Sequence, residues 1–286
     1  MSGFAYPPSP LKFLRHAPAT FLDRAGPFLE RAEAENNLLL GIGASLARGE
    51  MTLSALPVVA TVEDGDEVVL AALRTPPHNL LLSTGTERAL AVLCDALKAD
   101  GTGLPGVTGP ADLAAVFAER WAGDACERVM TQHVYQCTEV VAPKDPGGAF
   151  RAARLQELDR LVAYVVAFNE EANNPGTEAS ARRMVKGLVE KARIFVWDAD
   201  GDIVSIATAR QPTPHGIRVG YVYTPPVERR KGYASAITAK VTQRMFDEGY
   251  QMCFLYTDAS NPTSNAIYQR VGYEPMGDSA MWRFTA

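Results

Sequence analysis

Cysteine is scarce in this chain of 286 residues, and the few cysteines present are far apart. The four are Cys94, Cys126, Cys137 and Cys253, and no two of them form a Cys-x-x-Cys pair. This spacing excludes a cysteine-based zinc motif and a disulfide scaffold. We therefore expect reduced, mostly buried thiols and no bound metal.

Long apolar runs and a large excess of one charge are also missing. The longest apolar run, 38–47, contains two glycines and is too short to span a bilayer. Residues 1–16 contain three prolines and no apolar core, so they do not resemble a signal peptide. The net charge of -5 gives no general reason to bind nucleic acid or an anionic membrane. We expect a cytoplasmic protein without such partners.

What the chain does contain is an ordinary globular composition, with 47% hydrophobic and 21% charged residues. Its length is sufficient for two domains. The segment Lys144-Asp-Pro-Gly-Gly148 is the best linker candidate, because it combines charge with proline and glycine.

The most informative stretch is 220–245. Residues 220–224 are aromatic and β-branched, as in a buried strand, and Pro225 and Pro226 must end that strand. Arg229, Arg230 and Lys231 then precede Gly232, after which apolar residues recur with helical spacing. A helix that begins there presents unpaired backbone N–H groups beside basic side chains, which suits a pyrophosphate.

Two common phosphate loops do not fit this stretch. A Walker A loop requires Gly-Lys-Ser/Thr, and the dinucleotide fingerprint requires three spaced glycines. The pattern that fits is Arg/Gln-x-x-Gly-x-Gly/Ala, filled by Arg229, Gly232 and Ala234. It resembles the coenzyme A loop of the GNAT superfamily of N-acetyltransferases. One helix and one strand later, a second GNAT-like segment contains Asn261, Tyr268, Gly272 and Tyr273.

The resemblance implies an α/β (α+β) fold with a mixed, mainly antiparallel twisted sheet flanked by helices. It covers residues 146–286, and the strand over 274–284 is expected to close that sheet. Residues 1–145 are interpreted as a degenerate GNAT-like domain without a phosphate loop. Thr75-Pro-Pro77 parallels Thr224-Pro-Pro226, but His78-Asn79-Leu80 follows where a basic residue and a glycine would be needed.

By the same resemblance, the cosubstrate is acetyl-coenzyme A and no metal is required. The implied cofactor-binding residues are Val222, Tyr223, Thr224, Arg229, Arg230, Lys231, Gly232, Tyr233, Ala234, Asn261 and Tyr268. Tyr268 is the implied general acid, and a backbone N–H of Val222 or Tyr223 would polarise the thioester carbonyl. The alternatives are a tyrosine that only packs on the sheet and a strand whose N–H groups all pair within it.

The acceptor and the general base are not identified by any pattern. Glu170, Glu171 and Asp258 are weak candidates for the base, and His215 is expected on a surface loop. The predicted function is transfer of acetyl to a primary amine of a small molecule or peptide. A non-catalytic coenzyme A-binding regulatory protein and a nucleotide phosphate binder are the alternatives.

Overall fold

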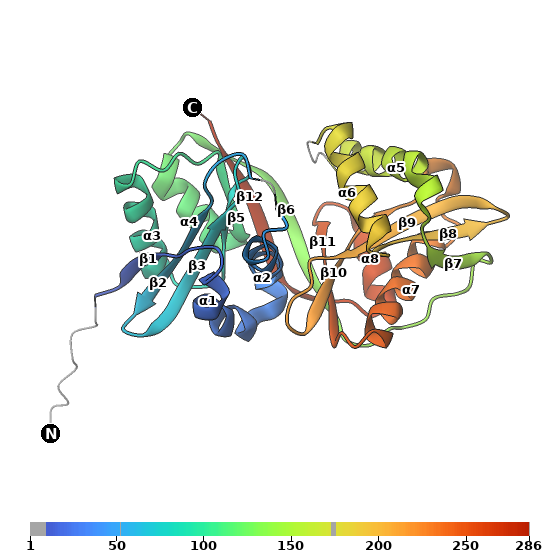
Figure 1. Cartoon of the computed structure of the whole chain (residues 1–286), viewed down its shortest axis with the longest axis horizontal. Helices are drawn as coiled ribbons and strands as arrows, with labels where there is room; N and C mark the ends of the chain where they lie inside the picture. Colours follow the sequence, from blue (N-terminus) through green and yellow to red (C-terminus); the bar gives the residue numbers. More distant parts are fainter. Residues whose placement is uncertain (1–9, 52, 173–175, 286) are drawn as a thin grey trace, which may run out of the picture. The chain divides into compact units, whose positions relative to one another are not determined.

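The computed structural model describes residues 10–51, 53–172 and 176–285. The chain forms two compact units, which are described separately (Figure 1). One comprises residues 1–132 and 277–286, and the other comprises residues 133–276. The expected break at Asn173-Asn-Pro175 lies outside the described residues.

The first unit contains a sheet with helices on both faces. Its elements are β1 (Lys12–Arg15), α1 (Phe21–Leu29), η1 (Glu30–Ala32), α2 (Glu33–Ala47), β2 (Val58–Asp64), β3 (Glu67–Arg74), β4 (Leu80–Leu82), α3 (Glu87–Ala99), β5 (Gly106–Pro110) and α4 (Ala111–Ala122). The strands are antiparallel from β1 to β4, whereas β4 and β5 are parallel. One core lies under α1 and α2, and a second lies under α3 and α4.

The second unit repeats this order of elements. It contains β7 (Ala149–Ala152), η2 (Leu155–Glu157), α5 (Leu158–Glu171), α6 (Glu178–Glu190), β8 (Ile194–Ala199), β9 (Asp202–Arg210), β10 (Gly216–Tyr223), η3 (Pro226–Glu228), α7 (Tyr233–Asp247), β11 (Met252–Asp258) and α8 (Pro262–Val271). Strands β7 to β10 are antiparallel, and β10 and β11 are parallel around α7. The mixed, mainly antiparallel sheet expected from the sequence is thus present twice.

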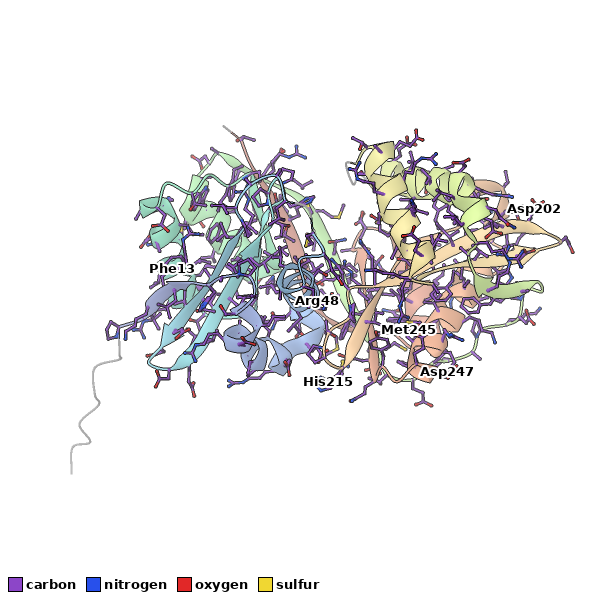
Figure 2. All side chains as sticks on the ribbon, in the orientation of Figure 1. Phe13, Arg48, Asp202, His215, Met245 and Asp247 are labelled. Carbon is purple, nitrogen blue, oxygen red and sulfur yellow. The ribbon has the colours of Figure 1, made fainter. Side chains whose placement is uncertain are left out.

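The sheet of the second unit has a separate core on each face. Apolar residues of α5 and α6 pack on one face, and those of α7 and α8 pack on the other (Figure 1). Figure 2 labels two residues of α7 that mark its sides: Met245 is fully buried, whereas Asp247 is exposed. Alternate residues of β9 and β10 therefore contribute to opposite cores, as the two-residue period of a strand requires.

The last strand does not close the sheet that the sequence analysis assigned to it. β12 (Glu274–Phe284) pairs with β5 of the first unit from Ser279 to Arg283. Conversely, β6 (Cys126–Cys137) precedes the linker candidate, yet its residues 133–137 belong to the second unit, where β6 follows β11 in the strand order. The expected boundary at 145/146 places 133–137 in the first domain and 277–286 in the second, and it therefore differs from these two units.

The recurrence of Thr-Pro-Pro does not reflect the internal repeat. Thr75-Pro-Pro77 follows β3, whose counterpart in the second unit is β9, whereas Thr224-Pro-Pro226 follows β10. The true counterpart of the basic loop is Ser83–Thr86, which follows β4 and precedes α3. Ser83–Thr86 contains neither arginine nor lysine. A Cβ on Gly85 would lie 2.6 Å from the Leu70 side chain, so this loop packs closely on β3.

Candidate functional site: the β10–α7 junction

The junction between β10 and α7 depends on Gly232. This residue occupies the N-cap position of α7 with a φ of 95°, in the left-handed region that favours glycine. No side chain caps the helix, and its first backbone bond runs from the Ala236 N–H to the Gly232 carbonyl. Within the described residues, the N–H groups of 230–234 have no backbone partner outside the helix. They form a group of donors at the positive end of the helix dipole.

The three basic side chains of this loop are placed differently from one another. Arg229 donates from Nη2 to both carboxylate oxygens of Glu171 at 2.7 Å, and from Nε to the Thr224 carbonyl at 3.0 Å. Lys231 pairs with Glu228 at 2.9 Å, which raises the pKa of Lys231. Arg230 is exposed and has a φ of 65°.

β10 contains a bulge immediately before this loop. Gly220 pairs with Thr208 of β9 and Tyr223 pairs with Ile206, so two residues of β10 oppose the single residue between these partners. Tyr221, inside the bulge, has a φ of 48°. The Thr208 hydroxyl donates to the Gly220 carbonyl at 2.9 Å.

At the C-terminal side of the bulge, a second hydroxyl of β9 also donates to a backbone carbonyl of β10. The Ser205 hydroxyl lies 3.0 Å from the Tyr223 carbonyl, to which it donates, and 2.9 Å from the Thr224 hydroxyl. Sequence reasoning missed both Ser205 and Thr208. The available signal was two hydroxyl residues within an otherwise apolar strand.

β10 and β11 part at the level of the bulge. Their parallel pairing covers only 216–218 of β10 and 252–254 of β11. The pairing of these two strands therefore ends before the bulge. Backbone groups beyond Arg218 on β10 have no β11 partner in that register, which leaves an open edge next to Val222.

Tyr223 is placed by its side chain in the core under α5 and α6. It is 7% exposed, its ring lies 5.6 Å from that of Tyr164, and its hydroxyl lies 3.4 Å from Glu171. Burial, together with the nearby Glu171 carboxylate, raises the pKa of Tyr223. Val222 points the other way and packs against the core under α7.

Tyr268 is more buried than the expected position on the flank of α8 suggested. It is 9% exposed and lies with its ring centroid 6.4 Å from Tyr135 and 6.1 Å from Tyr273. Burial alone raises the pKa of its phenol to about 12. Gly272 ends the helix with a φ of 103°, and a Cβ there would lie 2.4 Å from the Glu139 carbonyl oxygen.

The remaining candidates have local roles. Asn261 caps α8 by accepting the Ser264 N–H at 3.0 Å. Asp258 accepts the N–H and the hydroxyl of Ser260. Glu170 is exposed at the end of α5. His215 lies on the loop between β9 and β10, as expected (Figure 2).

The described residues contain neither a cluster of metal ligands nor a helix that could span a membrane. Across 10–51, 53–172 and 176–285, no group of three or more His, Cys, Asp or Glu is arranged to hold a metal ion. No helix in the same ranges is both long and apolar enough to cross a membrane.

The bulged strand, the open N-terminus of α7 and the two-sided sheet agree with the GNAT-like fold that the sequence resemblance predicts. Residues 163–273 match the sequence model of the Acetyltransferase (GNAT) family. The C-terminal half of the chain is therefore a GNAT domain. The search of curated proteins returned no match.

Solved structures extend the similarity to nearly the whole chain. A GCN5-related N-acetyltransferase from Sphaerobacter thermophilus has 18% identity and a TM-score of 0.63, with 96% of each chain covered. A GNAT-family acetyltransferase from Colwellia psychrerythraea has 11% identity and a TM-score of 0.61, with 96% of this chain and 100% of that chain covered. A tandem GNAT protein from the clavulanic acid biosynthesis pathway has 13% identity and a TM-score of 0.56, with 96% and 97% covered. At these identities the comparison establishes the fold.

Proposed function

We propose that the protein is an acyl-coenzyme A-dependent N-acyltransferase that moves acetyl from acetyl-coenzyme A to a primary amine. The observation that carries this proposal is the group of N–H donors at 230–234 that have no backbone partner outside α7 in the described residues, next to the edge where β10 parts from β11. Backbone donors at a helix N-terminus suit a pyrophosphate. An unpaired strand edge suits an extended pantetheine arm, which can pair with it as an added strand does.

Two groups of residues would bind the diphosphate and the pantetheine arm of this cosubstrate. The N–H groups of 230–234 and the exposed Arg230 side chain would hold the diphosphate, while Val222 to Thr224 would align the arm. Arg229 supports the loop, because Glu171 and the Thr224 carbonyl bind its guanidinium. We assign Arg229 a positioning role for that reason.

The transfer itself requires one bond to form and one to break. The neutral amine attacks the thioester carbonyl carbon, the carbon–sulfur bond breaks, and the departing sulfur takes a proton. The backbone N–H of Val222 or Tyr223 would stabilise the negative charge on the carbonyl oxygen. Tyr268 would supply the proton to sulfur. The amine proton would pass to one of Glu170, Glu171 and Asp258.

Four free cysteines and a coenzyme A substrate are consistent with the cytoplasm, where thiols stay reduced. We therefore propose that compartment. The acceptor would be an amine on a small molecule or a peptide. Residues 1–145 would form a degenerate domain without a phosphate loop, because Ser83–Thr86 lacks the basic residues found at 229–231.

The binding step is tested with a matched pair of glycine variants. Gly232→Val forces a β-branched residue into a φ of 95° at the donor group, and Gly249→Val does the same at 99° beyond the other end of α7. We expect both to lose similar stability, by about 1–3 kcal/mol. Only Gly232→Val should lose binding of acetyl-coenzyme A, measured by isothermal titration calorimetry. Normal binding by Gly232→Val would refute the site.

The chemistry is tested by release of thiol from acetyl-coenzyme A with a panel of amines. Turnover by the wild type supports the enzyme. Binding without turnover of any amine would instead favour a regulatory coenzyme A-binding protein. Protection against thermal unfolding by ATP equal to that by coenzyme A would favour a nucleotide phosphate binder.

A further inference from the structure

Two arginines lie directly opposite each other on β9 and β10, of which Arg218 is buried and Arg210 is half-buried. Arg210 pairs with Arg218 in the antiparallel register. Their neighbours Ala209 and Val219 belong to the core under α7, so by the two-residue period both arginines point to the opposite face. This is the face covered by α5 and α6. Arg218 is 8% exposed.

The groups around this arginine pair are aromatic or neutral. The Arg210 guanidinium lies 4.8 Å from the ring centroid of Tyr221 and donates to the Met184 sulfur at 3.7 Å. The Arg210 Nε is buried and has no hydrogen-bond partner among the residues that the structure describes. Arg218 donates to the side-chain oxygen of Gln211. None of these contacts is a carboxylate.

The absence of a counter-charge makes this arrangement costly. Burial lowers the pKa of both guanidinium groups, and together with the nearby charge of Arg210 it brings the pKa of Arg218 to about 9. Like charges opposite each other on a strand pair repel, and a buried unpaired charge is strongly unfavourable. An anion bound between the two would offset both effects. By contrast, Arg193, a half-buried arginine of the same unit, has an acidic partner in Glu248 at 2.6 Å.

The arginine pair is also in the right place for an acceptor. Tyr221, which stacks on Arg210, is itself part of the β10 bulge. The diphosphate donors belong to α7, which packs on the other face of the sheet. A nucleophile that attacks a thioester held at the strand opening would therefore approach from the arginine face.

We propose that the acceptor amine carries a carboxylate, as an amino acid or a peptide C-terminus does, and that Arg218 and Arg210 bind that carboxylate. This inference rests on the proposed acetyltransferase function. The planar fork of an arginine matches a carboxylate in a bidentate manner. Tyr221 and Phe168, whose ring centroids are 4.9 Å apart, would line the path for the remainder of the acceptor.

The test compares amino acids with their carboxamides and with matched aminophosphonates as acceptors. We expect kcat/KM to be about 100-fold higher for the carboxylates than for the amides, because charged hydrogen bonds to both arginines are lost with the amide. Arg218→Met should remove most of this preference, mainly through KM. Arg210→Met provides the second variant, in case Arg218→Met does not fold.

Arg193→Met is the matched control, because it removes a partly buried arginine that has an acidic partner. It should lower thermal stability and leave the carboxylate preference intact. Arg218→Met should instead keep or raise the melting temperature, since it removes an uncompensated buried charge. A merely structural role of Arg218 predicts the reverse.

Several results would overturn the inference. Equal rates with acids and amides, an unchanged preference in both arginine variants, or an equally strong preference for phosphonates would each refute the carboxylate site. These outcomes leave acetyl transfer itself intact. Failure of the proposed function is distinct, because then neither the acids nor the amides would release thiol from acetyl-coenzyme A.

Discussion

At the scale of single residues, Tyr268 carries the strongest kinetic prediction. We expect Tyr268→Phe to lower kcat about 100-fold, because the departing sulfur then receives no proton from the phenol. The affinity for acetyl-coenzyme A should change little. Burial raises the pKa of Tyr268 to about 12, so the proton-donating form persists as pH rises and is lost only near that value. Steady-state rates between pH about 8 and about 10.5 should therefore show no fall caused by Tyr268.

The control for this variant is Tyr250→Phe. Tyr250 lies beneath Arg193, with 6.0 Å between the guanidinium and the ring centroid, and the proposed chemistry does not use it. Its variant should retain the wild-type kcat. If Tyr268→Phe also retained it, another group would have to supply the proton, and Tyr268 would be a packing residue.

The site residues that sequence reasoning could predict are those fixed by local geometry. Gly232, Asn261 and Gly272 act through their own backbone or their nearest turn, and the positions of turns and caps are visible in the sequence. The pairing of Arg229 with Glu171 was not predictable, because it joins residues that are distant in the chain. For the same reason, the position of the Tyr223 side chain under α5 could not be predicted from the sequence.

At the scale of elements, the bulge of β10 depends on hydroxyl groups of β9. We expect Thr208→Val, which keeps the shape of the side chain, to leave the Gly220 carbonyl without its 2.9 Å donor. The cost is about 1–3 kcal/mol of stability. Because the bulge sets the open edge of β10, KM for acetyl-coenzyme A should also rise. Chemical denaturation and steady-state kinetics measure the two effects.

Thr242→Val separates the two effects. Thr242 is fully buried, and its hydroxyl bonds the Tyr273 hydroxyl at 2.7 Å, away from β10. This variant should lose comparable stability and keep its KM. A parallel rise of KM in both variants would mean that the bulge is not what the cosubstrate depends on.

Most ends of helices and strands could be predicted from turn and cap residues. The wrongly predicted ends are those set by pairing with residues distant in the chain. Thr177 caps α6 through the Ser180 N–H, as expected. β6 begins at Cys126 and ends at Cys137, whereas the alternating pattern indicated a strand from 128 to 141. Residues beyond Cys137 no longer follow the ladder, because the Val141 N–H bonds the carbonyl of Val271 after α8.

At the scale of the whole chain, the same order of elements occurs twice, but the strands after α4 and α8 are exchanged. A sequence indicates that a strand exists and which residues alternate, but not which sheet it completes. Residues 279–283 of β12 pair with β5. A division of the chain into two consecutive domains would put these two strands in different domains. The exchange explains why a division at 145/146 differs from the two compact units.

This exchange predicts which unit weakens when the C-terminus is removed. Deletion of 277–286 strips the partner strand from β5 and removes Phe284, which stacks on Trp121 at 6.2 Å. We expect the first unit to lose about 3 kcal/mol. Trp121 reports this unit, and Trp197, 4% exposed in the core under α7, reports the second.

With Trp282 deleted, single-tryptophan variants of the shortened chain isolate each signal. The fluorescence transition of Trp121 should move to lower temperature, while that of Trp197 stays near its position in the full chain. A shift of Trp197 alone would mean that β12 closes the second sheet after all. That outcome would restore the simpler arrangement of two sequential domains, in which each sheet is completed by the strand that follows its last helix.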